Sequence, residues 1–547
     1  MIRQLTGMFF LFCSVSISVS AQVPFTTIDS VDVNNIVATM LVHGDILRSF
    51  SSGTEGCIFP RGTRQNRIYP GALWLSGYDA GGQLHVAAQT YRYAGNDYWP
   101  GPLDASGSLD YATSYNWAKI WKVNRSDIQG FRSMGIHTTS NTPSMILTWP
   151  GKGNVYAQGN GGVTLTITTD MAPFVDLNGN GIYEPLQGEY PDIKGDQALW
   201  CVFSDNGPTH TQTNSNPLGV EIHAMSYAYK RGTLIDNVVY YDYTIVNRSS
   251  STYNNCRAGI WSDPGIGSSF NNYVGFDSVH RMAVLYCYYI GSSVGHPGSY
   301  VDDPIMGISL VSLPGDVGAN YVPAGSFIRY NNDASIMGDP TADTDYYNYM
   351  RATLRNGQHF TNDFVGRNIA SQCYGSGPDC NYLFTGDPSD TTQWSECNCG
   401  NDPGERQCIL SSNDFTLIPG GSQHMLMALV AADSAGGCPG ISFDSIKTVA
   451  DTAWAVYANS AEAVSNIAQQ TAIIYPNPAH DKLYFDAGSS ANEGSINVYN
   501  VLGQMMNTPI RKSGNQYVLD ISQFPGGFYN LLYRNSTTQQ AYKFVKQ

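Results

Sequence analysis

The chain has 547 residues, which at about 100–200 residues per domain predicts roughly three domains, or two if one β unit is large. Only 13% of its residues are charged, about half the usual share, and the net charge is −15. This composition excludes a coiled coil, which needs many Glu and Lys, and argues against a nucleic-acid binder, which needs clustered basic residues. With 42% hydrophobic and 12% aromatic residues, we expect a folded, mostly β protein.

The N-terminus predicts a secretory signal at residues 1–21. Arg3 is its only charge, residues 8–19 are apolar or small, and Val19-Ser20-Ala21 forms a small-x-small cleavage site. The alternative is an anchor helix, but the apolar stretch is too short to span roughly 30 Å of hydrocarbon. Since no other run approaches 18 apolar residues, we do not expect an integral membrane protein.

The body, residues 22–442, predicts a β-sandwich or jelly-roll-like fold. Strand-like runs recur at 163–168, 238–246, 283–290 and 424–431, and clusters of Gly, Pro, Asn and Asp separate them. The length suits either two packed β units or one large unit with long loops.

The sharpest motif in the body is the loop DLNGNGIYE at 176–184. Side-chain oxygens stand at loop positions 1, 3 and 5, a glycine at 6, a backbone carbonyl at 7 and a carboxylate at 9. These positions are Asp176, Asn178, Asn180, Gly181, Ile182 and Glu184. The pattern is typical of the first half of an EF-hand-type calcium loop, in which alternate positions supply oxygens to a hard cation.

The second half of this loop departs from the pattern. Position 12 holds Gln187 instead of a bidentate Glu, so Glu189, Asp192 or Asp196 would have to supply that ligand. We therefore predict a structural Ca²⁺ of modest affinity, with Asp192 in the ligand set. An Asx-turn without a metal is the alternative.

Removal of the signal would leave ten cysteines. An even number in an exported chain favours disulfides, and five of the ten crowd into residues 373–408, where little apolar content is available. Zinc is the weaker alternative because Cys397-Asn398-Cys399 is C-x-C instead of the paired C-x-x-C of a zinc knuckle. The pairing cannot be derived from the sequence.

The remaining polar and aromatic residues select no catalytic site. The chain has no H-E-x-x-H, G-x-S-x-G or P-loop, and we expect His85 and His424, which lie in apolar strands, to be satisfied by hydrogen bonds. A second acidic set is more typical of solvated loops than of calcium: Asp263, Asp277, Asp302 and Asp303. One aromatic group favours core packing over stacking on sugars: Tyr91, Tyr93, Tyr98 and Trp99.

Residues 443–469 predict a helix and a linker. Asp444 and Ser445 can cap a helix that runs to about Ala458, and the segment 461–470 reads as the connection to the C-terminal unit. The charge changes across this connection. Residues 22–469 carry 40 acidic and 22 basic residues, a net of −18, whereas residues 470–547 carry four acidic and six basic residues, a net of +2.

Residues 470–547 predict a small Ig-like β-sandwich, with turn signals at Asn477-Pro478, Leu502-Gly503 and Pro525-Gly526. The order of the segments 473–478, 482–485, 496–504, 519–522, 525–529 and 542–547 resembles the type A C-terminal sorting domain of the type IX secretion system of Bacteroidota. The resemblance implies recognition by that machinery, export across the outer membrane and removal of this domain. The body would then be attached to surface polysaccharide or released. The alternative is an ordinary Ig-like binding module.

Segments of the body resemble a module of large secreted Bacteroidota proteins that has no assigned activity, namely 72–77, 84–91, 98–103, 195–197, 346–349 and 417–420. The resemblance implies a location at the cell surface or outside the cell, after transit through the periplasm. It does not indicate an activity.

We expect a non-catalytic adhesin or matrix component that is stabilised by calcium and disulfides. A secreted hydrolase of polysaccharide or protein is the first alternative, and it would require two facing carboxylates or a His–carboxylate–nucleophile set. A carbohydrate-binding protein is the second. We expect partners among surface glycans and none among nucleic acids.

Overall fold

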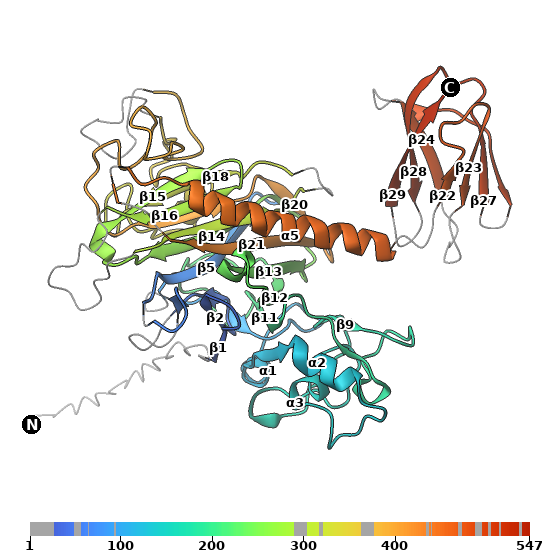
Figure 1. Cartoon of the computed structure of the whole chain (residues 1–547), viewed down its shortest axis with the longest axis horizontal. Helices are drawn as coiled ribbons and strands as arrows, with labels where there is room; N and C mark the ends of the chain where they lie inside the picture. The colour runs from blue at the N-terminus through green and yellow to red at the C-terminus, as the bar shows by residue number, and fades with distance from the viewer. Residues whose placement is uncertain are drawn as a thin grey trace, which may run out of the picture. The chain divides into compact units, whose positions relative to one another are not determined.

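The computed structural model of the chain is mostly β, as predicted, with few helices (Figure 1). It describes residues 27–48, 56–63, 65–91, 95–288, 303–316, 321–362, 377–433, 437–438, 440–468, 473–486, 495–500, 505–513, 516–534 and 539–547. The signal predicted at 1–21 lies outside these residues, as do Tyr93, Asp302 and Cys373. The chain divides into two compact units, and the boundary follows Trp454.

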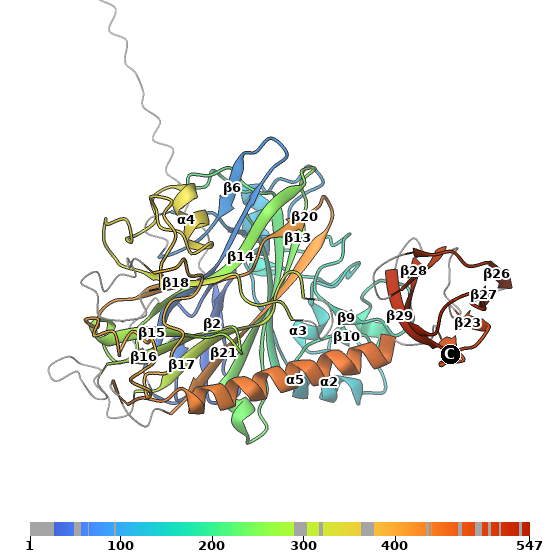
Figure 2. The same cartoon turned by 90° about the horizontal axis from the view of Figure 1, so that it is seen from above.

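The larger unit contains two antiparallel sheets (Figure 2). The ten-stranded sheet comprises β1 (Ile28–Val31), β2 (Val37–Leu41), β3 (Asp45–Ile46), β4 (Cys57–Ile58), β5 (Ile68–Tyr78), β6 (Leu84–Ala87), β14 (Tyr253–Pro264), β18 (Ser326–Tyr330), β19 (Gln407–Ser411) and β20 (Phe415–Leu417). Its main path is β1-β2-β3-β5-β14-β19-β18. Long, largely buried strands such as β5 and β14 form its centre.

The nine-stranded sheet runs in the order β15-β16-β17-β21-β13-β12-β11-β7, and β8 pairs with β11. Its strands are β7 (Trp99–Pro100), β8 (Trp121–Asn124), β11 (Gln197–Ser204), β12 (Val220–Ala228), β13 (Val238–Asn247), β15 (Asn272–Asp277), β16 (Met282–Cys287), β17 (Ile305–Ser312) and β21 (Ser422–Ala432). The strands predicted at 238–246 and 424–431 are therefore confirmed. One hydrophobic core joins this sheet to the ten-stranded sheet.

Alternation along β13 determines which side chains reach that core. Tyr241, Tyr243 and Ile245 are buried in it, and the Tyr241 hydroxyl donates to the Thr39 carbonyl of the other sheet at 2.8 Å. Successive side chains of a strand point to opposite faces. Asp242 therefore lies on the face of the nine-stranded sheet that is turned away from the core.

An insertion between β7 and β11 packs against this outer face. It contains α1 (Tyr111–Trp117), α2 (Arg125–Arg132), α3 (Ser144–Leu147), η1 (Asn160–Gly162), η2 (Pro185–Gln187) and the short hairpin of β9 (Phe174–Val175) with β10 (Tyr190–Pro191). Trp200 of β11 lies against Trp121 and Trp149, with ring centroids 5.8 and 6.1 Å apart, and all three are buried. Tryptophan packing therefore attaches the insertion to the sheet.

One predicted strand of this insertion is wrong. Residues 163–168 alternate as expected, with Leu165 and Ile167 buried, but they form no strand and make only one isolated bridge, at Thr164. Their backbone hydrogen bonds go to the irregular loop 153–159 instead of to a neighbouring strand. One side of this segment is buried, and this alone gives the alternating pattern of a strand although the segment pairs with no neighbouring strand.

The helix predicted at 444–458 is longer than expected. Helix α5 (Asp444–Ala468) continues through residues that we assigned to a linker, because the segment contains no Gly or Pro and many Ala. The other helices are α4 (Asp343–Tyr349), η3 (Leu234–Asn237) and η4 (Ser269–Asn271). Within the described residues, no helix is both long and apolar enough to cross a membrane.

A clasp around His280 holds the first half of α5 on the larger unit. The two ring nitrogens of His280 lie 2.5 Å from an oxygen of Asp277 and 2.9 Å from an oxygen of Asp451 on α5. Nearby, the Trp454 indole N–H donates to Ser309 at 2.9 Å. Burial alone would lower the pKa of His280, but the two carboxylates outweigh burial and raise it above 6.5.

The clasp should make stability depend on pH. Because the pKa of folded His280 is raised, the stability that it contributes is fully present below pH 6.5 and is lost as the pH rises through the raised pKa. We expect His280→Gln to destabilise the protein more at pH 6 than at pH 9, as measured by urea unfolding. The exposed His359→Gln should show no such difference, and an equal effect of His280→Gln at both pH values would contradict the clasp.

The smaller unit is a sandwich of two four-stranded sheets, as predicted. One sheet has the order β22-β23-β27-β26 and the other β25-β24-β28-β29. The strands are β22 (Ile473–Tyr475), β23 (Lys482–Asp486), β24 (Ser495–Asn500), β25 (Met505–Met506), β26 (Ile510–Ser513), β27 (Gln516–Asp520), β28 (Gly527–Arg534) and β29 (Gln539–Lys546). Leu483, Leu519 and Leu531 are fully buried between the sheets, so this unit has a core of its own.

Candidate functional site

A pocket of about 300 Å³ opens on the outer face of the nine-stranded sheet. Strands β11, β12, β13 and β21 supply Trp200, His223, Met225, Asp242, Thr244 and His424, and the insertion supplies Met171, Pro173, Asp192 and Lys194. The register explains the convergence, because Thr244 is directly opposite both His223 and His424. Three adjacent strands thus present a row of polar side chains beneath the insertion.

Asp242 lies at the centre of one hydrogen-bond network in the pocket. One of its oxygens lies 2.7 Å from His424 Nε2, and Lys194 Nζ donates to the other at 2.5 Å. Burial alone would raise the pKa of Asp242, but Lys194 and His424 outweigh burial and hold it well below its usual range. Asp242 is therefore a carboxylate that fixes the position of both basic side chains.

Glu221 has the same role beside His223. His223 Nε2 lies 2.8 Å from its carboxylate, Arg248 donates to it at 2.7 Å, and the backbone N–H of Leu103 donates to it at 2.9 Å. Glu221 is fully buried, and His223 and Arg248 lower its pKa against the opposing effect of burial. Each pocket histidine is thus oriented by a carboxylate, as in many sites that bind or transfer protons.

Ser312 extends the first network. Its hydroxyl lies 3.2 Å from His424 Nδ1, so Ser312, His424 and Asp242 form a nucleophile–base–acid sequence. However, Ser312 is only 5% exposed and does not line the pocket, and Lys194 shares the Asp242 carboxylate. The serine therefore orients the imidazole ring but is not presented to a ligand.

The predicted calcium loop is formed by a series of tight turns. The Asp176 carboxylate accepts the N–H groups of Gly179 and Gly181, both at 2.7 Å, and the amide groups of Asn178 and Asn180 donate to Glu184. The N–H of Ile182 donates to the Asn180 side chain at 2.8 Å. These five predicted ligand residues therefore lie in one loop.

Asp192, the sixth predicted ligand residue, lines the pocket instead. Of the three carboxylates considered for the missing ligand, Glu189 is the one that reaches the loop. It is fully buried and accepts the N–H groups of Leu177 and Glu184 at 3.1 and 2.7 Å. Burial and the nearby Asp176 charge raise its pKa. Among the described residues, no three His, Cys, Asp or Glu side chains gather as a metal-binding group.

Other predicted site residues are occupied by structural contacts. Tyr98 and Trp99 are buried, and the Tyr98 hydroxyl donates to the Ala87 carbonyl at 2.9 Å. Asp303 pairs with buried Arg67 at 3.1 Å, and His85 contacts the Pro217 carbonyl at 2.7 Å. These residues do not converge on one site.

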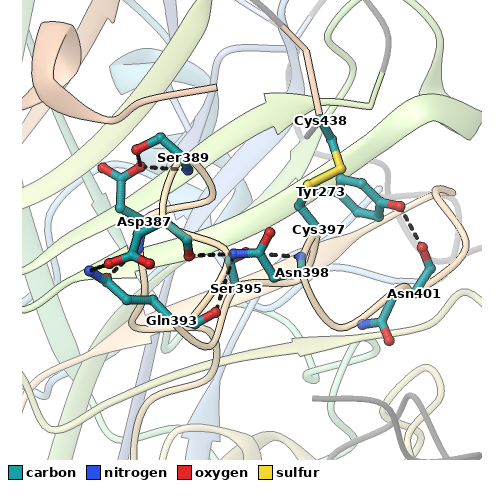
Figure 3. The surroundings of a disulfide bond; sticks show 10 residues. Tyr273, Asp387, Ser389, Gln393, Ser395, Cys397, Asn398, Asn401 and Cys438 are labelled. Atoms are coloured by element: carbon teal, nitrogen blue, oxygen red, sulfur yellow. Dashed lines mark hydrogen bonds between the residues drawn. A yellow bond between two sulfur atoms is a disulfide. The ribbon is translucent and has the colours of Figure 1, made fainter. Parts of the chain in front are cut away.

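One disulfide is present in the described residues, between Cys397 and Cys438, which are 41 residues apart (Figure 3). Beside it, the Asn398 side chain donates to the Asp390 and Gln393 carbonyls, which closes a compact loop. Six other described cysteines are free thiols: Cys57, Cys201, Cys256, Cys287, Cys380 and Cys408. Burial raises the pKa of Cys57 and Cys408 to about 12, so these thiols are unreactive at neutral pH.

The comparisons with known proteins assign the smaller unit. Residues 473–547 match the family model described as a secretion system C-terminal sorting domain, and this range contains all the strands of that unit. The protein is a cargo of the type IX secretion system. The cargo protein is thus exported to the cell surface or the extracellular space, and its sorting domain is recognised by the secretion machinery.

The comparisons assign no activity to the body of the cargo protein. A solved structure titled as a polysaccharide lyase matches with 7% identity and a TM-score of 0.16, over 60% of this chain and 34% of that chain. The cargo protein thus spans about a third of that protein, and a likeness this weak carries no argument. No curated protein matches the sequence.

Proposed function

We propose that the body acts outside the cell as a non-catalytic adhesin or matrix component that binds a glycan in the pocket between the nine-stranded sheet and the insertion. The observation that carries the proposal is the set of polar groups around a pocket of about 300 Å³. Sugar hydroxyls both donate and accept hydrogen bonds, and carboxylates beside imidazole and ammonium groups offer both partners. Met171 and Met225 add apolar surface for the C–H faces of a sugar ring.

A hydrolase is the second candidate. The hydrogen-bonded side chains of Ser312, His424 and Asp242, arranged like a catalytic triad, favour it. The low exposure of Ser312 is the reason to prefer binding. A fluorophosphonate probe separates the two candidates. Covalent labelling of Ser312 that disappears in His424→Gln would favour the hydrolase, and an unlabelled serine supports the binding protein.

The test of the binding proposal is a screen of neutral and acidic oligosaccharides, followed by calorimetry on the full chain. We expect Asp192→Asn and Thr244→Val to weaken binding of the selected glycan about tenfold each, as for the loss of one hydrogen bond to a charged group or hydroxyl. Asp170→Asn is the matched control on the same insertion, since its carboxylate is exposed and lies outside the pocket. Equal affinity in all variants would contradict the proposal.

We also propose that the loop 176–184 with Glu189 holds a structural Ca²⁺. At a free concentration about a hundredfold above Kd, calcium should raise the free energy of unfolding by about 2.7 kcal/mol. Melting of the full chain with calcium and with a chelator measures this effect. Glu189→Gln should lose most of the difference, whereas a melting temperature that chelation does not change would contradict the metal site.

A further inference from the structure

A second cluster of polar and aromatic side chains lies on the ten-stranded sheet. Trp261 of β14 is directly opposite Ile409 of β19, and Gln407 of β19 is directly opposite Tyr330 of β18. Residues two apart on a strand share a face. The face that carries Trp261 therefore also carries Asp263, Gln407 and Tyr330.

Tyr91 lies over this face and connects its polar groups. Its hydroxyl donates to an oxygen of Asp263 at 2.7 Å and accepts from Gln407 Nε2 at 3.0 Å. Its ring meets the Trp261 ring edge-on, with centroids 5.2 Å apart. Tyr91 and Asp263 are half-buried and Gln407 is buried, so these hydrogen bonds connect the region near the surface to the interior.

Gln407 supplies the observation that points to a ligand. Its side chain is on the Asp263 face and is only 1% exposed, yet its Oε1 has no hydrogen-bond partner in the described part of the chain. Buried acceptors in native proteins are nearly always paired with a donor from protein, water or ligand. This oxygen therefore calls for an N–H or O–H group from outside the described residues.

The charges around Asp263 indicate what kind of donor fits. Burial raises the pKa of Asp263 to about 8, the Tyr91 hydrogen bond opposes this shift, and the carboxyl groups of Glu405 and Asp339 add to it. None of these neighbours is basic. Burial and the nearby carboxyl groups of Asp333 and Glu405 also raise the pKa of Asp339, to about 6, although Arg355 lowers it. The described charged groups around Asp263 and Asp339 are thus predominantly acidic.

We propose that Tyr91, Asp263 and Gln407, with Asp339 and Glu405 beside them, bind an organic cation that carries N–H donors, an alkylammonium or guanidinium group. Such a cation donates to the carboxylate and to the amide oxygen, and its charge is attracted by the aromatic ring of Tyr91. The net charge of −18 on residues 22–469 would also draw cations to the body.

Binding of the organic cation would displace the proton that the Asp263 carboxyl group carries. At neutral pH the Asp263 carboxyl group carries a proton. When the ligand docks, the O–H bond of this group breaks, the proton passes to the buffer, and the carboxylate pairs with the ligand cation. Affinity should therefore rise as the pH approaches 8 and should level off above it. This site and its ligand class are independent of the glycan pocket.

The test is calorimetry on the full chain with butylammonium and butylguanidinium as probes, in two buffers of different ionisation heat. We expect binding with release of close to one proton at neutral pH. Asp263→Asn, which is nearly isosteric, should weaken binding about tenfold and abolish proton release. Asp390→Asn makes the same substitution at an exposed aspartate beside the disulfide loop, and it should change neither quantity.

Three outcomes would overturn the proposal: no binding of either probe, unchanged affinity in Asp263→Asn, or binding without proton release. Tyr91→Phe provides a second variant if Asp263→Asn unfolds, and it should also weaken binding, because it removes the hydroxyl that connects Asp263 and Gln407. Spermidine and a lysine-containing peptide then distinguish the sources of the cation. Tighter binding of spermidine indicates a free polyamine, and tighter binding of the peptide indicates a basic protein partner.

Discussion

A chain that lacks residues 473–547 should accumulate inside the cell envelope and should no longer reach the cell surface or the medium. These residues have two sheets and a core of their own and match the sorting-domain family, so the deletion removes the complete recognition unit. The body keeps its separate core and should remain folded. Immunoblots of periplasmic, surface and culture fractions measure the redistribution.

Point substitutions sharpen this result, because a deletion also shortens the chain. Leu531→Asp places a charge at a fully buried position of the sorting domain and should block export as the deletion does. Met505 is 67% exposed in the same domain, and Met505→Asp should leave export unchanged. Surface delivery of the deleted chain would contradict the assignment of these residues as the export signal.

Glu396→Gln should lower the free energy of unfolding of the larger unit by about 3–5 kcal/mol. Glu396 is fully buried, and its carboxylate lies 2.9 Å from Arg329 and 2.8 Å from Arg406, both of which are also buried. The other carboxylate oxygen accepts the N–H of Val274 at 2.9 Å. Neutralising the glutamate removes the buried carboxylate that both guanidinium groups contact, and this cost exceeds the net value of the ion pairs themselves.

Urea unfolding of the full chain measures this loss for the larger unit. Asp402→Asn is the matched control, since Asp402 is exposed and belongs to the same loop, and it should change stability by no more than about 0.5 kcal/mol. A loss below about 1 kcal/mol for Glu396→Gln would mean that water reaches the two arginines.

The fold could be predicted where the local pattern and the sheet agree. Residues 238–246 alternate because one face packs in the core and the other faces the insertion, and residues 424–431 are apolar because β21 is central in its sheet. The segment 163–168 has the same alternation but no neighbouring strand, and pairing partners are not encoded locally. The end of α5 was misplaced, although its continuation contains many Ala and no Gly or Pro, a composition that favours a helix.

The candidate sites differ in how far their residues are separated in the chain. The calcium loop was visible because Asp176 to Glu184 are consecutive. The pocket could not be predicted from the sequence, because it combines residue 192 with residues 223, 242 and 424. Only the register of the sheet brings these residues together. One local signal was available, since Glu221 and His223 are two apart in a strand and therefore share a face. The remaining contacts required the topology.

The cysteines show the same limit. An even number in an exported chain predicted disulfides without their pairing, and the described residues contain one, between Cys397 and Cys438. Cys57 and Cys201 instead lie fully buried in strands, where a free thiol packs as a small apolar side chain. Whether a cysteine pairs depends on which strand faces it, and that information is non-local.

Hydrogen–deuterium exchange of the full chain, with and without the oligosaccharide selected by the glycan screen, tests the central claim that the exported body binds a glycan in its pocket. Binding there should slow exchange in residues 171–194 of the insertion and in β12, β13 and β21 around His223, Asp242 and His424. Unchanged exchange in these segments, or protection confined to another part of the body, would contradict the account.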